Sequence, residues 1–169
     1  PEYLAINPRG TIPTLVPDDG PALTDFRSIA LWLAERYPRA RLLPDDPALA
    51  ARAVELLDFA LGQLHGEGFT RIFTAERYLA APGERAREDV VAHGREIVAQ
   101  AFDILEKRLP AEGYVVGERF TVADAALFYN EFWADRTQIP LPPRVAAHYR
   151  RLRALPVVRQ VLAEEGYRS

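Results

Sequence analysis

Residues 7–33 read NPRGTIPTLVPDDGPALTDFRSIALWL. Two short apolar runs, at 14–16 and 22–23, flank the segment PDDGP. An Asp-Gly pair between two apolar runs is a strong signal for a tight turn that joins two strands. The sequence therefore predicts a β-hairpin in this part of the chain.

A helix is expected directly after the hairpin. Thr24 and Asp25 both have side chains that cap helix N-termini, and Pro38 ends the helix after about Tyr37. The apolar side chains of this helix are expected to be buried: Ile29, Leu31, Trp32 and Leu33.

The hairpin and the helix together suggest a ligand site. Pro13 stands at the entrance of the first strand, and the sequence leaves either isomer of the Ile12-Pro13 bond open. If the bond is cis, the backbone of Ile12 faces outward and can pair with an extended peptide. The free amides at the helix start favour a carboxylate. We therefore expect a site for a small acidic peptide, although a small α/β domain without a ligand has the same features.

The remainder of the chain is expected to be helical. Asp46 and Pro47 have the residue types of an N-cap and a first helical position, and apolar residues then recur at helical spacing to about Leu64. The glycines in HGEGF, residues 65–69, predict the end of this helix. Further helical segments are expected before Pro82, from about Arg85 to Leu109, after Thr121, after Pro143 and after Pro156. These patterns predict an α+β portion over residues 1–43 and an all-helical domain over residues 44–169.

The segment FTVAD, residues 120–124, has the spacing of a capping box. Thr121 can cap the amide of Asp124, and Asp124 can reach back to the amide of Thr121. We interpret Thr121 and Asp124 as a structural cap, because the cap accounts for the spacing without a catalytic acid. The helix behind it is apolar enough to lie in the middle of a bundle.

Composition narrows the classes of function. With 169 residues, of which 49% are hydrophobic, the chain can bury a core, and its net charge of −3 argues against a nucleic-acid partner. No apolar run reaches membrane-spanning length and no signal peptide opens the chain, so we expect a cytoplasmic protein without a membrane partner. The chain has no Cys and three scattered His, so no metal site is expected. The arginines between 144 and 159 are expected to form a solvated face without acids.

Several motifs resemble one family. The order N-P-x-G-x-[IV]-P-x-L, a D-G turn and L-T-[ED]-x-x-x-I resembles the second half of the thioredoxin-like domain of glutathione transferases. FTVAD resembles the capping box of their helical domain, and ELLDF, QLH, GF and the ending PVVRQVLAEEG resemble bacterial beta-class members. The resemblance implies a partial thioredoxin-like portion followed by an all-α bundle of about five helices, and a homodimer.

The resemblance also implies a glutathione site, with glutathione as the co-substrate. In the family, the backbone of the residue before a cis-proline pairs with the cysteinyl part; Ile12 would be that residue here, and Thr11 would occupy the preceding contact position. Asp25 and Phe26 take the place of the acid-Ser pair at the γ-glutamyl end. The acid is one methylene shorter than Glu, and the hydroxyl is missing.

The sequence contains only part of the catalytic groups that the resemblance implies. The family's catalytic Tyr, Ser or Cys belongs to a strand-helix-strand unit expected upstream of Pro1, so the catalytic residue is unknown in this sequence. His65 matches a histidine that lies near glutathione in the beta class, and an imidazole that only caps a helix end stays open as the alternative. Phe69, Phe73 and Tyr78 either line an apolar pocket or belong to the core.

Two functions follow from this interpretation. The first is a glutathione transferase that conjugates the glutathione thiol to small apolar electrophiles, with a role in detoxification. The alternative is a non-catalytic, transferase-like binding or regulatory protein.

Asp58 stands where the family has an Asn, and this change from amide to acid leaves the contact of residue 58 open.

Overall fold

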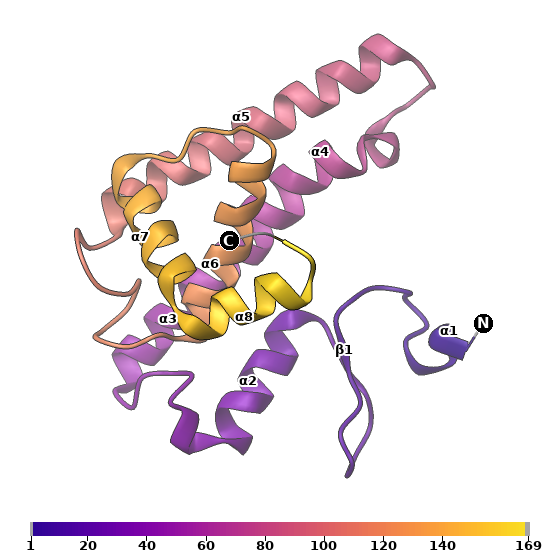
Figure 1. Cartoon of the computed structure of the whole chain (residues 1–169). Helices are drawn as coiled ribbons and strands as arrows, with labels where there is room; N and C mark the ends of the chain where they lie inside the picture. The colour runs from indigo at the N-terminus through magenta and orange to yellow at the C-terminus, as the bar shows by residue number, and fades with distance from the viewer. Residues whose placement is uncertain (1, 168–169) are drawn as a thin grey trace.

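The computed structural model describes residues 2–167; residues 1, 168 and 169, the outer ends of the two expected domains, lie outside the described residues. A small hairpin portion is followed by a helical bundle (Figure 1). The elements in chain order are α1 (Glu2–Ile6), β1 (Thr14–Leu15), β2 (Leu23–Thr24), α2 (Phe26–Arg36), η1 (Pro38–Ala40), α3 (Pro47–Phe59), η2 (Ala60–Phe69), α4 (Thr70–Phe73), η3 (Ala75–Tyr78), α5 (Glu84–Arg108), α6 (Val122–Arg136), α7 (Pro143–Ala154) and α8 (Pro156–Glu164).

The predicted hairpin is confirmed. Strands β1 and β2 pair antiparallel, with Thr14 opposite Thr24 and Leu15 opposite Leu23. The helix α2 follows β2 after a single residue, Asp25. The short helix α1 precedes the hairpin and was not expected from the sequence.

The expected burial of α2 is wrong. Ala30 is the one buried residue of this helix, and its large apolar side chains are only half-buried: Ile29, Leu31, Trp32 and Leu33. Among the described residues, α2 packs on the hairpin and on the helical bundle and keeps part of its surface open. The N-cap position is correct, but the side chain of Asp25 makes no capping hydrogen bond, because it forms an ion pair with Arg9 instead.

The helix that begins at Pro47 does not end at the glycines. It continues as a π-helix, η2, and then as α4, with right-handed helical dihedrals at both Phe69 and Thr70. A Cβ at Gly68 would lie 2.5 Å from Cγ2 of Val98, and a Cβ at Gly94 would lie 2.9 Å from the carbonyl oxygen of Gly68. The glycines therefore allow η2 and α5 to pack closely, and they do not break the chain.

The bundle has α6 at its centre, as its apolar sequence predicted. The larger hydrophobic core includes Leu64, Phe69, Phe102 and Leu127, which come from η2, α5 and α6. A second cluster joins α2 to α3 and α6, and the amide of Val122 donates to the carbonyl of Leu42 at 2.9 Å. The N-terminal part of α5 and the segment around α4 project away from the rest of the molecule (Figure 1).

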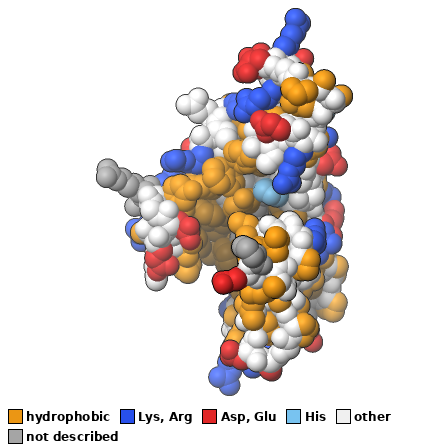
Figure 2. Space-filling view, turned by 90° about the vertical axis from the view of Figure 1, so that its right-hand side faces the viewer, with side chains coloured by type: hydrophobic (Ala, Val, Ile, Leu, Met, Phe, Trp, Pro, Cys, Tyr) orange, Lys and Arg blue, Asp and Glu red, His pale blue; other side chains and the backbone are white. Residues whose placement is uncertain are grey.

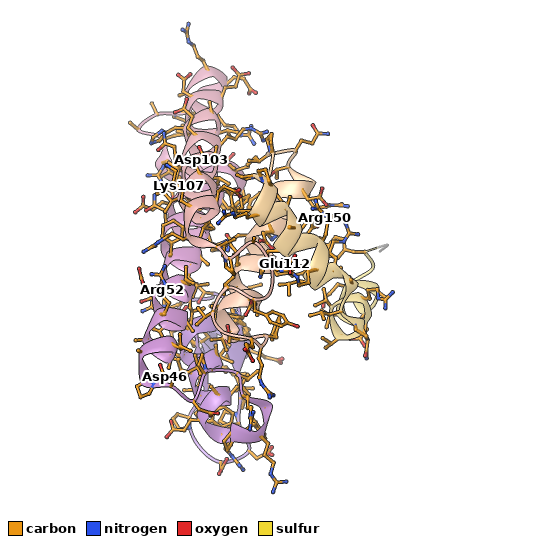
Figure 3. All side chains as sticks on the ribbon, turned by 90° about the vertical axis from the view of Figure 1, so that its left-hand side faces the viewer. Asp46, Arg52, Asp103, Lys107, Glu112 and Arg150 are labelled. Carbon is orange, nitrogen blue, oxygen red and sulfur yellow. The ribbon has the colours of Figure 1, made fainter. Side chains whose placement is uncertain are left out.

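Charged side chains cover the outer faces of the helices. Asp103 and Lys107 on α5 and Arg150 on α7 are exposed and point outward (Figure 3). The expectation of a basic face without acids is wrong in part. Arg153 lies 3.8 Å from the carboxylate of Asp135, and other arginines of α7 donate to loop carbonyls.

Candidate functional site

The loop before β1 exposes an unpaired stretch of backbone. The Ile12-Pro13 bond is cis, and 84% of Ile12 is exposed. Within residues 2–167, neither the amide nor the carbonyl of Ile12 has a hydrogen-bond partner in the structure. Ile12 therefore offers one donor and one acceptor to an extended peptide.

Asn7 holds this loop in place. Its side chain is 1% exposed, and its Nδ2 donates to the carbonyl of Thr11 at 2.7 Å and to Oγ1 of Thr14 at 3.1 Å. The backbone amide of Arg9 donates to Oδ1 of Asn7 at 3.1 Å. The Thr11 carbonyl is thus used within the loop, whereas the backbone groups of Ile12 stay free. Asn7 opens the N-P-x-G motif, and its place in the sequence did not reveal this role.

The start of α2 provides the second part of the candidate site. Asp25 has a φ of 69° and its side chain is 47% exposed and paired with Arg9. The ring of Phe26 packs into the cluster that joins α2 to the bundle, beside residues such as Ala30 and Leu57. Phe26 can therefore offer a ligand its backbone amide, since the first amides of a helix have no partner within the helix.

Asp58 serves the contact between α2 and α3. Its Oδ1 lies 2.6 Å from Nε of Arg27, and about half of each side chain is exposed. The change from amide to acid at this position is thus matched by a cation on α2.

His65 lies in the middle of η2, so it does not cap a helix end. Its ring centroid is 5.4 Å from that of Tyr129 on α6, and among the described residues its buried Nδ1 has no hydrogen-bond partner. Burial lowers the pKa of His65 below its usual value. Burial therefore favours the neutral imidazole, while the side chain as a whole stays partly exposed.

A group of aromatic side chains lies beside His65. Trp133 contacts Tyr129, at 6.2 Å between ring centroids, and Phe73, at 5.0 Å. Tyr129 and Phe73 are each nearly half exposed. Figure 2 shows hydrophobic side chains gathered in a hollow on the side of the molecule that lies to the right in Figure 1. We call Phe73, Trp133 and Tyr129 the aromatic wall.

The sequence identified part of this wall. Phe69 is fully buried and belongs to the core, whereas Phe73 is in the wall. Tyr78 stays 39% exposed, and the guanidinium of Arg71 lies over its ring at 4.5 Å from the centroid. Tyr129 and Trp133 were missed as site residues because their helix was treated as wholly buried.

The structure brings the candidate groups together in two places. Arg9 and Asp25 meet beside the Ile12 loop, and His65 meets the aromatic wall. No hydrogen bond or ion pair joins these two places within the described part of the chain. That they form one site is therefore part of the proposal made below.

The capping box is present and belongs to a buried ionic cluster. Oδ2 of Asp124 accepts from the amide of Thr121 at 2.7 Å, and Oδ1 accepts from the amide of Val115 at 2.9 Å. His148 lies between Asp124 and Glu131, with nitrogen–oxygen distances of 3.1 and 2.8 Å. From the sequence, His148 was expected only in the body of a helix, and Glu131 had no predicted role.

The cluster holds a proton on His148. Burial alone lowers the pKa of His148, but its hydrogen bonds to Asp124 and Glu131 outweigh burial and raise the pKa to about 9. Burial raises the pKa of Glu131, and the contact with His148 opposes this shift. These groups are closed off from solvent, so we assign them to stability and not to binding.

Residues 2–167 show no metal-binding cluster and no helix that could cross a membrane. Within that range, no three His, Asp or Glu side chains gather in a way that would hold a metal ion. None of the helices in the same range combines the length and apolar character needed to cross a membrane.

Comparisons with known proteins agree with these features. The family model described as glutathione S-transferase, N-terminal domain, matches residues 1–36, and the corresponding C-terminal domain model matches residues 88–151. Glutathione S-transferase GstA of Escherichia coli O157:H7 is 32% identical over 171 residues, covering 98% of this chain and 79% of GstA.

Two solved structures are similar in fold. A glutathione transferase homologue from Sulfitobacter with bound glutathione superposes with a TM-score of 0.85 at 27% identity, covering 99% of this chain and 80% of that one. A beta-class glutathione S-transferase from Sphingomonas chungbukensis has a TM-score of 0.79 at 27% identity, covering 98% of this chain and 79% of that one.

Proposed function

This chain belongs to the glutathione S-transferase family and is a glutathione transferase, and we propose that it conjugates the glutathione thiol to small apolar electrophiles. The observation that carries the proposal is the exposed, unpaired backbone of Ile12 in a loop that the Arg9–Asp25 ion pair joins to the start of α2. A peptide-like thiol with a free carboxylate is the ligand that suits these two features.

In this proposal the cysteinyl part of glutathione pairs with the backbone of Ile12. The γ-glutamyl carboxylate accepts from the amides at the start of α2, including that of Phe26. The γ-glutamyl ammonium takes the place of Arg9 beside Asp25, whose side chain is partly exposed. The missing hydroxyl at position 26 is offset because backbone amides, not the side chain, make this contact.

The chemistry requires a thiolate. A thiol of ordinary pKa, about 8.5, is mostly protonated at pH 7, so the enzyme gains rate by stabilising the sulfur anion. In our proposal the imidazole of His65, a partly exposed side chain, supplies one hydrogen bond near that sulfur. The electrophile lies on the aromatic wall, the sulfur forms a bond to its carbon, and the leaving group departs with the electron pair.

The setting of the enzyme is also proposed. We infer a homodimer in the cytoplasm that acts in detoxification, and we place the chain in the beta class. The beta-class resemblance of the segments around His65 supports these inferences, as does the half-open apolar surface of α2. The non-catalytic alternative finds no support among the relatives.

The proposal is tested by turnover together with binding. We expect the purified protein to conjugate glutathione to a chromogenic chloronitroarene, and millimolar glutathione to raise its thermal midpoint, because a ligand that binds the folded state stabilises it. No turnover and no thermal shift at concentrations of about 10 mM would contradict the proposal. Oxidised glutathione is the control for non-specific effects of charge and ionic strength.

A further inference from the structure

The segment that carries His65 is a π-helix over ten residues, Ala60–Phe69. At its end the amide of Thr70 donates to the carbonyl of His65, five residues earlier. π-Helices are rare, occur mostly as single turns and are frequent at functional sites. A stretch of this length therefore needs contacts that hold its register.

Three carbonyls of this segment accept side-chain donors. Oγ1 of Thr70 donates to the carbonyl of Gly66, and Nη1 of Arg71 donates to that of Glu67. Both donors lie on the same continuous helix. The third donor comes from another helix, because Nδ2 of Asn130 on α6 donates to the carbonyl of Ala60 at 3.2 Å. Of these three contacts, only that of Asn130 ties the π register to the bundle.

Asn130 is built firmly into its own helix. It is 0% exposed, and its Nδ2 also donates to the carbonyl of Ala126 at 2.8 Å. The preceding residue, Tyr129, contacts the ring of His65. Ala60 and His65 are five residues apart, which is the hydrogen-bond spacing of a π-helix. Two consecutive residues of α6 thus contact both ends of one π turn.

We propose that Asn130 is a positioning residue, which holds the Ala60 carbonyl and thereby fixes the register that turns His65 toward Tyr129. A change to α geometry from Ala60 onward would rotate the His65 side chain by roughly a quarter of a turn. The ring would then leave the aromatic wall. The inference rests on the proposed role of His65 near the sulfur, but the position of the ring is measurable without turnover.

Gly66 gives independent support for the register. A Cβ at Gly66 would lie 3.0 Å from the carbonyl oxygen of Leu61, five residues earlier. A methyl group at this position would crowd the carbonyl of Leu61 within the π turn. It would lie on the solvent-exposed side of the helix, because Gly66 is exposed. Gly66→Ala therefore disturbs the same register as Asn130 variants do, without altering the core.

The test follows the titration of the His65 imidazole by NMR in the full chain, which has only two other histidines, His93 and His148. We expect a wild-type pKa below the usual value. In Asn130→Ala and Asn130→Ser the pKa rises toward that value, because the ring leaves its buried position. Serine keeps a donor for the carbonyl of Ala126 but is too short to reach Ala60.

Gly66→Ala is expected to shift the His65 pKa in the same direction. The matched control is Thr137→Val, which removes a 2.7 Å bond to the carbonyl of Trp133 on the same helix and leaves His65 unchanged. The buried His148 resonance reports an intact bundle in every variant. If Asn130→Ala does not fold, Asn130→Ser and Gly66→Ala still decide the question.

Kinetics separate positioning from a general structural effect. We expect Asn130→Ser to lower kcat about tenfold while the KM for glutathione stays within about twofold of wild type. An unchanged His65 pKa in both Asn130→Ser and Gly66→Ala would overturn the inference, even in an active enzyme. If the His65 pKa rises in these variants while the wild-type protein shows no turnover, the positioning role of Asn130 is supported and the proposed function is contradicted.

Discussion

Nε2 of His148 lies 3.1 Å from Oδ1 of Asp124, and both side chains are almost completely buried. The same carboxylate caps α6 and binds the amide of Val115, while the other imidazole nitrogen contacts Glu131. One imidazolium therefore joins α7 to two points on α6. Removing one partner from such a buried cluster strongly destabilises the fold, because it leaves a buried charge without an opposite charge beside it.

Replacing His148 is expected to destabilise the fold strongly. His148→Gln removes the cation and leaves two buried carboxylates, at a cost of about 3–5 kcal/mol. Urea unfolding measures this cost. His93 is exposed, so His93→Gln is the control and should change the free energy of unfolding by less than about 0.5 kcal/mol. Equal effects of the two substitutions would show that the cluster contributes nothing to stability.

The same cluster predicts a loss of stability at alkaline pH. The pKa of His148 is raised from 6.5 to about 9 in the folded state, so its contribution is complete below pH 6.5 and is lost as the pH rises through 9. The wild-type free energy of unfolding should fall by up to about 3 kcal/mol across this range. Unfolding of His148→Gln should lack this His-linked decrease. Parallel pH profiles for the two proteins would contradict the assignment of the proton to His148.

Close packing of η2 on α5 gives a third prediction. A Cβ at Gly94 would lie 2.8 Å from Cβ of Arg71 and 2.9 Å from the Gly68 carbonyl oxygen, so Gly94→Ala should cost about 1–3 kcal/mol of stability. Gly62 is the control, since a Cβ there meets nothing within 4 Å. Gly62→Ala should be neutral or stabilising by up to about 1 kcal/mol. Equal thermal midpoints for the two variants would argue against the tight contact.

The aromatic wall gives a fourth prediction. Phe73→Ala removes an exposed ring that contacts Trp133, so it should raise the KM for an aromatic electrophile about fivefold and leave the KM for glutathione unchanged. Steady-state kinetics with both substrates varied measures this. Ile104→Ala, at another exposed apolar residue, on α5, is the control. A rise in the KM for glutathione alone would place Phe73 at the glutathione-binding part of the site and contradict its place at the electrophile.

Local signals in the sequence predicted the elements whose causes are local. The Asp-Gly turn, Pro47 after Asp46, and the capping box of Thr121 all act within a few residues, and each is present in the structure. The isomer of the Ile12-Pro13 bond was left open by the sequence, and the structure shows that the bond is cis.

Features that depend on distant contacts were not predictable in the same way. Gly66 and Gly68 carry the local signature of a break, yet the helix continues, with α5 packed on Gly68 and Asn130 bonded to the carbonyl of Ala60. Glu131 and His148 become a charge cluster only when α6 and α7 pack together. Tyr129 becomes a site residue because the π-helix turns His65 toward it.

The backbone of Ile12 is the group on which glutathione binding depends in this account. Ile12→Pro removes its amide proton, and Ile12→Ala removes the side chain but keeps the amide. Calorimetric titration with glutathione should show a Kd within about twofold of wild type for Ile12→Ala and at least about tenfold weaker binding for Ile12→Pro, with unfolding midpoints close to wild type in both. Equal affinities in the two variants would contradict the proposed pairing of glutathione with Ile12.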